Sequence, residues 1–401
     1  MPFRFPLPRF PIAPDFLRAS ALIMPLALAL MVIAPASGAD VTVAKFRLNV
    51  PGAFCFTFDD ALPTQLIYAA PYLDQVGLKG SFYLITNNVV DGAAGSPAIG
   101  KATTWADWKV VADSGHEIGS HTLTHRDLTT LTADVVAKEL TESGAKIKEK
   151  LGITPVTLAY PYNARNAAVT KAMLQTYIAA RESQVGYGSE PGMANTVAAM
   201  NKFLDDAIAG KKVQIGMIHG LTEPYSPTDP AMFLEHLKYC RKLVDDKRLW
   251  VPTFGTYSRY RIEKDSVRIV NLPSTLPHTI EFRAESPLDS AVFNVPLTFL
   301  YKIPDLPADS VKVMRANAPV PFQFNGELVL IEALPGPAAI TISWNASSDG
   351  IRAILPGTGR KDGKAPGDLR LINGQREPMK KGLPTGPLFG TQPAQSQIRI
   401  P

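Results

Sequence analysis

The sequence has only two cysteines, Cys55 and Cys240, in 401 residues. So few thiols exclude a small disulfide-stapled scaffold, and the length instead suits two folding units or one large barrel with an addition. Both cysteines lie in apolar surroundings, so buried thiols and a disulfide both remain open. No internal repeat is visible. A GxSxG motif is also missing, so nothing indicates a serine nucleophile on a strand-to-helix elbow.

The central part of the chain has no excess of positive charge. The formal net charge is +5, but residues 1–39 contribute +2 and residues 351–401 contribute +6, which leaves the segment between them at −3. A nucleic-acid-binding protein needs lysine and arginine clustered on its folded surface. We therefore expect no nucleic-acid partner.

One apolar stretch near the N-terminus, at residues 21–34, follows Arg18 and precedes the small residues 36–39. This layout predicts a secretory signal peptide, residues 1–39, cleaved after Ala39. The stretch is short for a membrane span and contains Pro25, so an uncleaved membrane tether is the weaker alternative. We expect an exported protein, periplasmic or extracellular, that contacts a membrane only if this segment is retained.

Periodicity divides the rest of the chain into three parts. Up to about residue 263, short apolar runs alternate with helical patterns, which predicts a parallel α/β sheet, open or closed into a barrel. The strands are expected at 53–58, 80–85, 156–160, 214–218 and 249–254, and the helices at 63–76, 105–114, 132–151, 167–176 and 230–245. Residues 264–350 alternate with period two, which predicts a small antiparallel β-sandwich-like domain. The Pro- and Gly-rich basic segment 351–401 is expected to be a disordered tail.

Three of the six histidines, His116, His121 and His125, fall within ten residues. A spacing of four can place His121 and His125 on one face, where two imidazoles suit a divalent metal ion. A carboxylate would be the third ligand of a catalytic site with an open position. His116 is expected to be structural, because three protein ligands already complete such a site.

The carboxylates Asp59 and Asp60 directly follow the apolar strand expected at 53–58. They therefore lie at the edge of a parallel sheet where active sites are found. Either one can be the third metal ligand, while the other takes a proton from a water whose pKa the metal has lowered.

Four motifs follow one another in order. They are TFDD at 57–60, HTLTH at 121–125, AYPYN at 159–163 and QIGMIHG at 214–220. This order resembles the NodB-like polysaccharide deacetylase family, carbohydrate esterase family four, over residues 50–262. The resemblance implies a distorted (β/α)7 barrel. It also implies Asp59 as the catalytic base, His219 as the general acid, a backbone amide at Tyr162 that faces the oxyanion, and Asp60, His121 and His125 as metal ligands.

Two positions depart from the family pattern. Ala159 stands where the family often has an arginine directed toward the base, and Arg181 is a candidate replacement or an ordinary surface arginine. Asn163 replaces a more usual glycine, and asparagine tolerates a positive φ nearly as well.

The sequence thus predicts a metal-dependent hydrolase that uses Zn²⁺, or another divalent transition metal such as Co²⁺. Its substrate would be an acetylated amino-sugar polysaccharide, namely chitin-like, poly-N-acetylglucosamine or peptidoglycan glycan. The alternatives are an O-acetyl esterase acting on a xylan-type polysaccharide, and a non-catalytic glycan-binding or assembly protein that retains the barrel.

Overall fold

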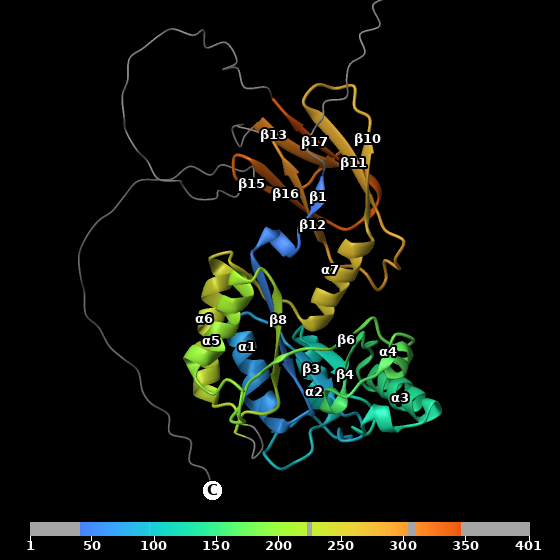
Figure 1. Ribbon diagram of the computed structural model, residues 1–401, viewed down its shortest axis with the longest axis vertical. Helices are drawn as coiled ribbons and strands as arrows, with labels where there is room; N and C mark the ends of the chain where they lie inside the picture. Colours follow the sequence, from blue (N-terminus) through green and yellow to red (C-terminus); the bar gives the residue numbers. More distant parts are fainter. Residues whose placement is uncertain (1–40, 96, 223–226, 304–309, 346–401) are drawn as a thin grey trace, which may run out of the picture. The chain divides into compact units, whose positions relative to one another are not determined.

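Eight parallel strands form one curled sheet in the first part of the chain (Figure 1). The structure is a computed structural model and describes residues 41–95, 97–222, 227–303 and 310–345. The strands are β2 (Gly52–Phe58), β3 (Ser81–Leu84), β4 (Glu117–Ser120), β5 (Thr157–Ala159), β6 (Ala179–Arg181), β7 (Val185–Gly186), β8 (Val213–Ile218) and β9 (Leu249–Trp250). Their order is β6-β5-β4-β3-β2-β8-β7, with β9 also paired to β2. The predicted distorted barrel is confirmed, and β6 and β7 are the two edges of its sheet.

Helices alternate with these strands along the chain. They are η1 (Arg47–Asn49), the π-helical turn η2 (Gln65–Ala69), α1 (Ala70–Gln75), α2 (Trp105–Asp113), η3 (Leu128–Thr130), α3 (Ala133–Leu151), η4 (Pro161–Asn163), α4 (Ala167–Met173), α5 (Val197–Ala209), α6 (Pro230–Asp245) and α7 (Phe254–Ser266). The longest, α3, begins after Thr132 as predicted. It ends at Gly152, whose φ of 76° is the left-handed conformation that glycine adopts at low cost.

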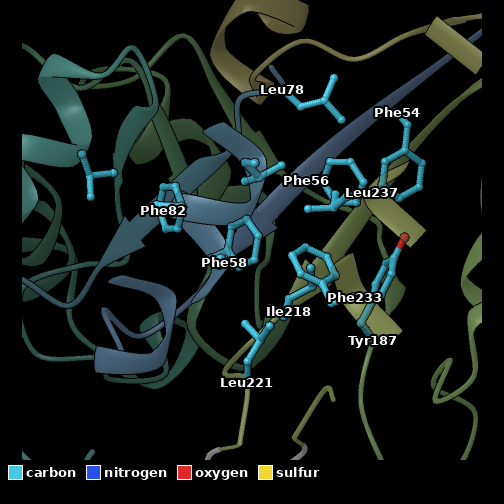
Figure 2. Packing of buried hydrophobic residues seen from close by; sticks show 14 of the residues in the cluster. Phe54, Phe56, Phe58, Leu78, Phe82, Tyr187, Ile218, Leu221, Phe233 and Leu237 are labelled. Atoms are coloured by element: carbon cyan, nitrogen blue, oxygen red, sulfur yellow. The ribbon is translucent and has the colours of Figure 1, made fainter. Parts of the chain in front are cut away.

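All seven residues of β2 are buried, and the alternation of the strand separates them into two sets. Phe54, Phe56 and Phe58 face the large core that is covered by helices, where Phe58 stacks on Phe82 with ring centroids 4.7 Å apart (Figure 2). Each such ring stabilises the fold by about 1.5–3 kcal/mol. Cys55 packs in a different cluster, and because side chains alternate, Thr57 and Asp59 share its side of the sheet. The phenylalanines thus fix the register that turns Asp59 away from the main core.

The second part of the chain is the predicted antiparallel β domain. One sheet has the order β1-β12-β16-β15 and the other β10-β11-β17-β13-β14. Their strands are β1 (Thr42–Val43), β10 (Arg268–Leu272), β11 (Thr279–Glu285), β12 (Leu297–Lys302), β13 (Val311–Arg315), β14 (Ala318–Pro319), β15 (Phe322–Phe324), β16 (Leu328–Ala333) and β17 (Gly336–Trp344). Phe282 of one sheet and Phe299 of the other lie in one core with ring centroids 5.5 Å apart, so the sheets pack face to face.

The structure corrects one predicted strand. The strand expected at 249–254 ends at Trp250, because Thr253 caps a new helix by accepting a hydrogen bond from the amide of Thr256, and Phe254 begins α7. Strands β4, β6 and β7 and helices α5 and α7 were not predicted. Three of these are strands of four residues or fewer, which are too short for periodicity to show.

Cys55 and Cys240 are both free and buried, so the bridge between them is not formed. Within the described ranges, no helix is both long enough and apolar enough to cross a membrane. The predicted signal peptide and the predicted tail lie outside the described residues.

Candidate active site

The ends of β2 and β8 bring the first and last motifs together. Phe58 and Ile218 are register partners, and the amide of Asp59 donates to the carbonyl of Ile218 at 3.0 Å. Asp59 directly follows β2 and His219 directly follows β8, so the two residues lie at the same level of the sheet. This is the carboxyl-end edge of the parallel sheet, where the sequence predicted the site.

Asp60, His121 and His125 form a cluster of possible metal ligands, with one ligand atom from each lying within 4.8 Å of the others. The Nε2 atoms of His121 and His125 are 3.2 Å apart. Oδ1 of Asp60 lies 3.4 Å from Nε2 of His121 and 3.6 Å from Nε2 of His125. Two imidazoles and one carboxylate are the ligands of many catalytic zinc sites, so these residues fit such an ion.

The backbone of Ala159 fixes the orientation of His121. The Nδ1 atom of His121 lies 2.8 Å from the Ala159 carbonyl, which can only accept, so Nδ1 carries the proton. In the neutral ring Nε2 then has a free lone pair, and this is the atom that faces Asp60. A hydrogen bond of this kind commonly orients a metal-binding histidine.

Arg181 reaches the carboxylate of Asp59 from β6. Its Nη1 donates to Oδ1 of Asp59 at 2.8 Å and to the hydroxyl of Thr57 at 2.9 Å, while Nη2 donates to Oδ2 of Asp59. Both residues are almost fully buried. The structure therefore places Arg181 as the partner of Asp59 and not on the surface.

Positive charges near the site lower the pKa values of both its carboxylates, Asp59 and Asp60. Burial alone would raise the pKa of Asp59, but Arg181 and then His121 outweigh it and hold that pKa below its usual value. Burial is again outweighed at Asp60, where the hydrogen bond from His121 and the charges of the nearby histidines lower the pKa to about 2. Both groups are therefore ionised at neutral pH. Two carboxylates beside two imidazoles favour a bound cation.

Asp59 and Asp60 also act on His121. Burial works against its charged form, yet the two carboxylates outweigh burial and raise the pKa of His121. The pKa of His125 is lowered, chiefly by burial and then by the charge of His121. The field that would favour an imidazolium at His121 equally favours a metal ion there.

Tyr162 lies in the turn η4 beside the cluster. Two hydrogen bonds define this turn, from the amides of Asn163 and Ala164 to the carbonyls of Tyr160 and Pro161. The amide of Tyr162 takes no part in them. Tyr162 is 68% exposed, and the centroid of its ring lies 4.7 Å from that of the His125 ring.

Several non-glycine residues in or next to the motifs at 57–60, 121–125 and 159–163 have a positive φ. They are Asp60 (75°), Ala61 (58°), Thr122 (68°), His125 (61°), Tyr162 (56°) and Asn163 (55°). Left-handed backbone is costly for residues with a side chain and is concentrated at functional sites. Asn163 adopts the positive φ that was expected where the family has glycine.

The sequence analysis missed Glu139, which holds the loop between the two histidines. Its buried carboxylate accepts hydrogen bonds from the amides of Leu123 and Thr124 at 3.0 and 2.9 Å, and from the Thr124 hydroxyl. A signal was available, since Glu139 is an acid on the apolar face of the helix predicted at 132–151.

The structure also separates His116 and His236 from the site. His116 precedes β4, at the amino end of that strand and away from the carboxyl ends where the site lies, and its Nδ1 accepts from the amide of Gly80 at 3.0 Å. His236 lies in α6 and contacts the hydroxyl of Tyr187 at 2.9 Å. Both are buried and structural, as expected for His116.

A family model described as polysaccharide deacetylase matches residues 51–180. This part of the chain belongs to the polysaccharide deacetylase family. The matched segment includes Asp59, Asp60, His121, His125 and Tyr162, whereas Arg181 and His219 lie beyond its end.

The chain is also similar to individual proteins. It is 26% identical over 354 residues to a gellan lyase from Bacillus sp., a match that covers 78% of this chain and 14% of that protein. It is 31% identical over 123 residues to a chitin deacetylase from Pestalotiopsis sp., covering 30% of this chain and 37% of that protein. The chain thus spans less than two-fifths of the length of these curated relatives.

Among solved structures, the chitin deacetylase of Colletotrichum lindemuthianum matches with a TM-score of 0.40 and 19% identity. That match covers 54% of this chain and 89% of the other.

Proposed function

We propose that this protein is an exported, metal-dependent hydrolase that removes N-acetyl groups from an amino-sugar polysaccharide. One observation carries the proposal: a buried arginine keeps the carboxylate of Asp59 ionised, 3.9 Å from the Nε2 atom of the candidate ligand His121. A base of this kind beside a cation site suits the hydrolysis of an acyl group.

Asp60, His121 and His125 would hold the ion, which we propose is Zn²⁺ or another divalent transition metal such as Co²⁺. When bound, the ion supplies a Lewis acid that polarises the acetyl carbonyl and lowers the pKa of a water. Asp60 is already ionised and loses no proton when the ion binds. Nε2 of the neutral His121 ring is the atom that would bind the ion, whereas the imidazolium form, which the two carboxylates favour, releases a proton on binding.

Asp59 acts as the general base and takes the proton of the attacking water. Arg181 holds its two oxygens in place and keeps them deprotonated. The amide of Tyr162 donates to the acetyl oxygen as negative charge develops on it. His219 gives a proton to the nitrogen of the departing amine, without which an amine leaves poorly.

The substrate class follows from the family and from one relative. Similarity to a chitin deacetylase supports an N-acetylated glycan over an O-acetylated one. Chitin-like oligomers, poly-N-acetylglucosamine and peptidoglycan glycan all present the same acetamido group. The intact set of Asp59, Asp60, His121, His125 and His219 argues against a protein that only binds glycan.

Acetate release tests this function. Residues 40–401, stripped of metal and then supplied with Zn²⁺ or Co²⁺, are incubated with N-acetylated and O-acetylated glycans. We expect metal-dependent release from one N-acetylated class. Release from acetylated xylan alone would make the protein an O-acetyl esterase. No release, with metal bound and the fold intact, would favour the non-catalytic glycan-binding alternative.

A further inference from the structure

Gln65 links the backbones of the proposed base and the proposed acid. It is the first residue of η2 and is fully buried. Its Nε2 lies 2.5 Å from the carbonyl oxygen of Asp59 and 2.6 Å from that of His219. One side chain thus bridges two residues that are 160 positions apart in sequence. Each of them directly follows one of two neighbouring strands, β2 and β8.

The chemistry of the amide fixes its orientation. The NH₂ group of glutamine has two hydrogens, and here each has one carbonyl acceptor. Rotated by 180°, the amide would place its own oxygen against two carbonyl oxygens, which repel it. Gln65 can therefore serve this bridge in one orientation only.

The link lies where the regular sheet stops. Strands β2 and β8 end at Phe58 and Ile218, with one further bond between the Asp59 amide and the Ile218 carbonyl. Beyond that point Gln65 connects the two segments, and the hydroxyl of its neighbour Thr64 accepts from the amide of Leu221 at 3.0 Å. Gln65 also begins a π-helical turn, an irregularity that is frequent at functional sites.

We propose that Gln65 is a positioning residue that fixes the separation of Asp59 and His219. This inference rests on the proposed function, in which the two side chains act on opposite sides of one acetamido group. A displacement of 1 Å at such a pair can lower the rate by about 10²-fold. Two of the three proposed metal ligands, His121 and His125, come from another loop, and only Asp60 adjoins the bridged carbonyl. We therefore expect Gln65 to affect turnover more than metal binding.

The test compares Gln65→Met, which keeps the size of the side chain and removes both donors, with Gln214→Met. Gln214 is on β8, and no hydrogen bond to its side-chain oxygen is present among the described residues. We expect Gln65→Met to lower kcat by about 10–100-fold with KM within about 3-fold and the metal content unchanged. Gln214→Met should leave kcat within about 2-fold, since it removes no such contact.

A double-variant cycle separates positioning from a general structural role. If Gln65 acts through the acid, Gln65→Met should cost less than about 3-fold in a His219→Ala background. An equal loss in both backgrounds, or a rise in KM with kcat unchanged, would overturn the proposal.

Amide hydrogen exchange tests the Gln65 link even if no acetate release can be measured. If the wild-type protein releases no acetate, the proposed function fails, but the link is still tested. Gln65→Met should then speed amide exchange in both segments 59–61 and 219–221 relative to Gln214→Met, and unchanged exchange would refute the link. If Gln65→Met does not fold, Gln65→Asn, whose shorter amide cannot reach both carbonyls, takes its place in every measurement.

Discussion

Ala159 and Arg181 are register partners on the neighbouring parallel strands β5 and β6. Ala159, which departs from the family motif, thus lies beside Arg181, which supplies the missing charge, at one level of the sheet. From this position Arg181 donates to both oxygens of Asp59. The positive charge next to the proposed base is kept although it comes from the adjacent strand, so Ala159 does not argue against the proposed catalysis.

Replacing Arg181 with methionine should move the acid limb of the pH–rate profile upward. The pKa of Asp59 is now held below its usual value because Arg181 and His121 outweigh burial. Without Arg181, burial raises that pKa, and the base becomes protonated at higher pH. The profile of kcat/KM against pH checks this, and an acid limb at the wild-type position would contradict it.

The same variant should also be less stable, by about 3–5 kcal/mol at pH 7, because a buried carboxylate loses its partner. The sign follows from the lowered pKa: the pair stabilises the fold above the unfolded pKa of Asp59 and is lost as pH falls through the folded one. The double variant Ala159→Arg/Arg181→Ala should be more stable and more active than Arg181→Ala alone, since the two positions are adjacent and the new arginine can supply the charge.

Asp59→Asn should abolish turnover and leave metal binding intact. A general base contributes about 10²–10⁴-fold, and asparagine keeps the shape of the side chain without accepting the proton. The matched control is Asp60→Asn, at the neighbouring carboxylate, which should lose the metal. Metal analysis of both proteins beside acetate release distinguishes the roles, and turnover by Asp59→Asn above a tenth of wild type would exclude Asp59 as the base.

The sequence predicted most of the parallel sheet and the membership of the site, because both depend on local patterns. The alternating residues of β2 reveal a strand, and the motifs that follow the strands have to meet at one edge. The helix at 132–151 was recognised from its apolar spacing and its capping residues.

Contacts between distant residues could not be predicted in this way. Nothing near Gln65 in sequence indicates a bond to His219, and β6 has only three residues, which is too few for periodicity. Strand β1 was missed because its two residues pair with β12, more than 250 positions away.

Glu139→Ala should weaken metal binding by about 10–100-fold, the usual cost of losing a group that orients the ligands. Its carboxylate accepts from the amides of Leu123 and Thr124, between the two candidate histidine ligands, so its loss frees a loop with left-handed residues on both sides. Glu142→Ala is the control, since Glu142 is exposed and lies three residues further on the same helix. Titration of the metal-free proteins with Zn²⁺ checks this, and equal affinities in the two variants would contradict it.

His236 should make the fold sensitive to acid. Burial lowers its pKa to about 3, so the folded protein binds a proton less readily than the unfolded chain, whose histidines titrate near 6.5. Stability is therefore full above pH 6.5 and falls as pH drops toward 3, with a loss of about 2 kcal/mol at pH 5 from this residue.

The free energy of unfolding in urea at pH 8 and pH 5 checks this prediction. The difference between the two values should be about 2 kcal/mol smaller in His236→Gln than in wild type, because glutamine does not titrate. His278→Gln is the control, since His278 is exposed. Among the described residues, the ring nitrogens of His236 contact the buried Tyr187 hydroxyl and the Asn201 side chain. Both partners are uncharged, so neither contact offsets the charge of a proton taken up there. A difference that His236→Gln leaves unchanged would assign the acid sensitivity to other groups, first to the buried His116, whose pKa is lowered to about 4 chiefly by burial.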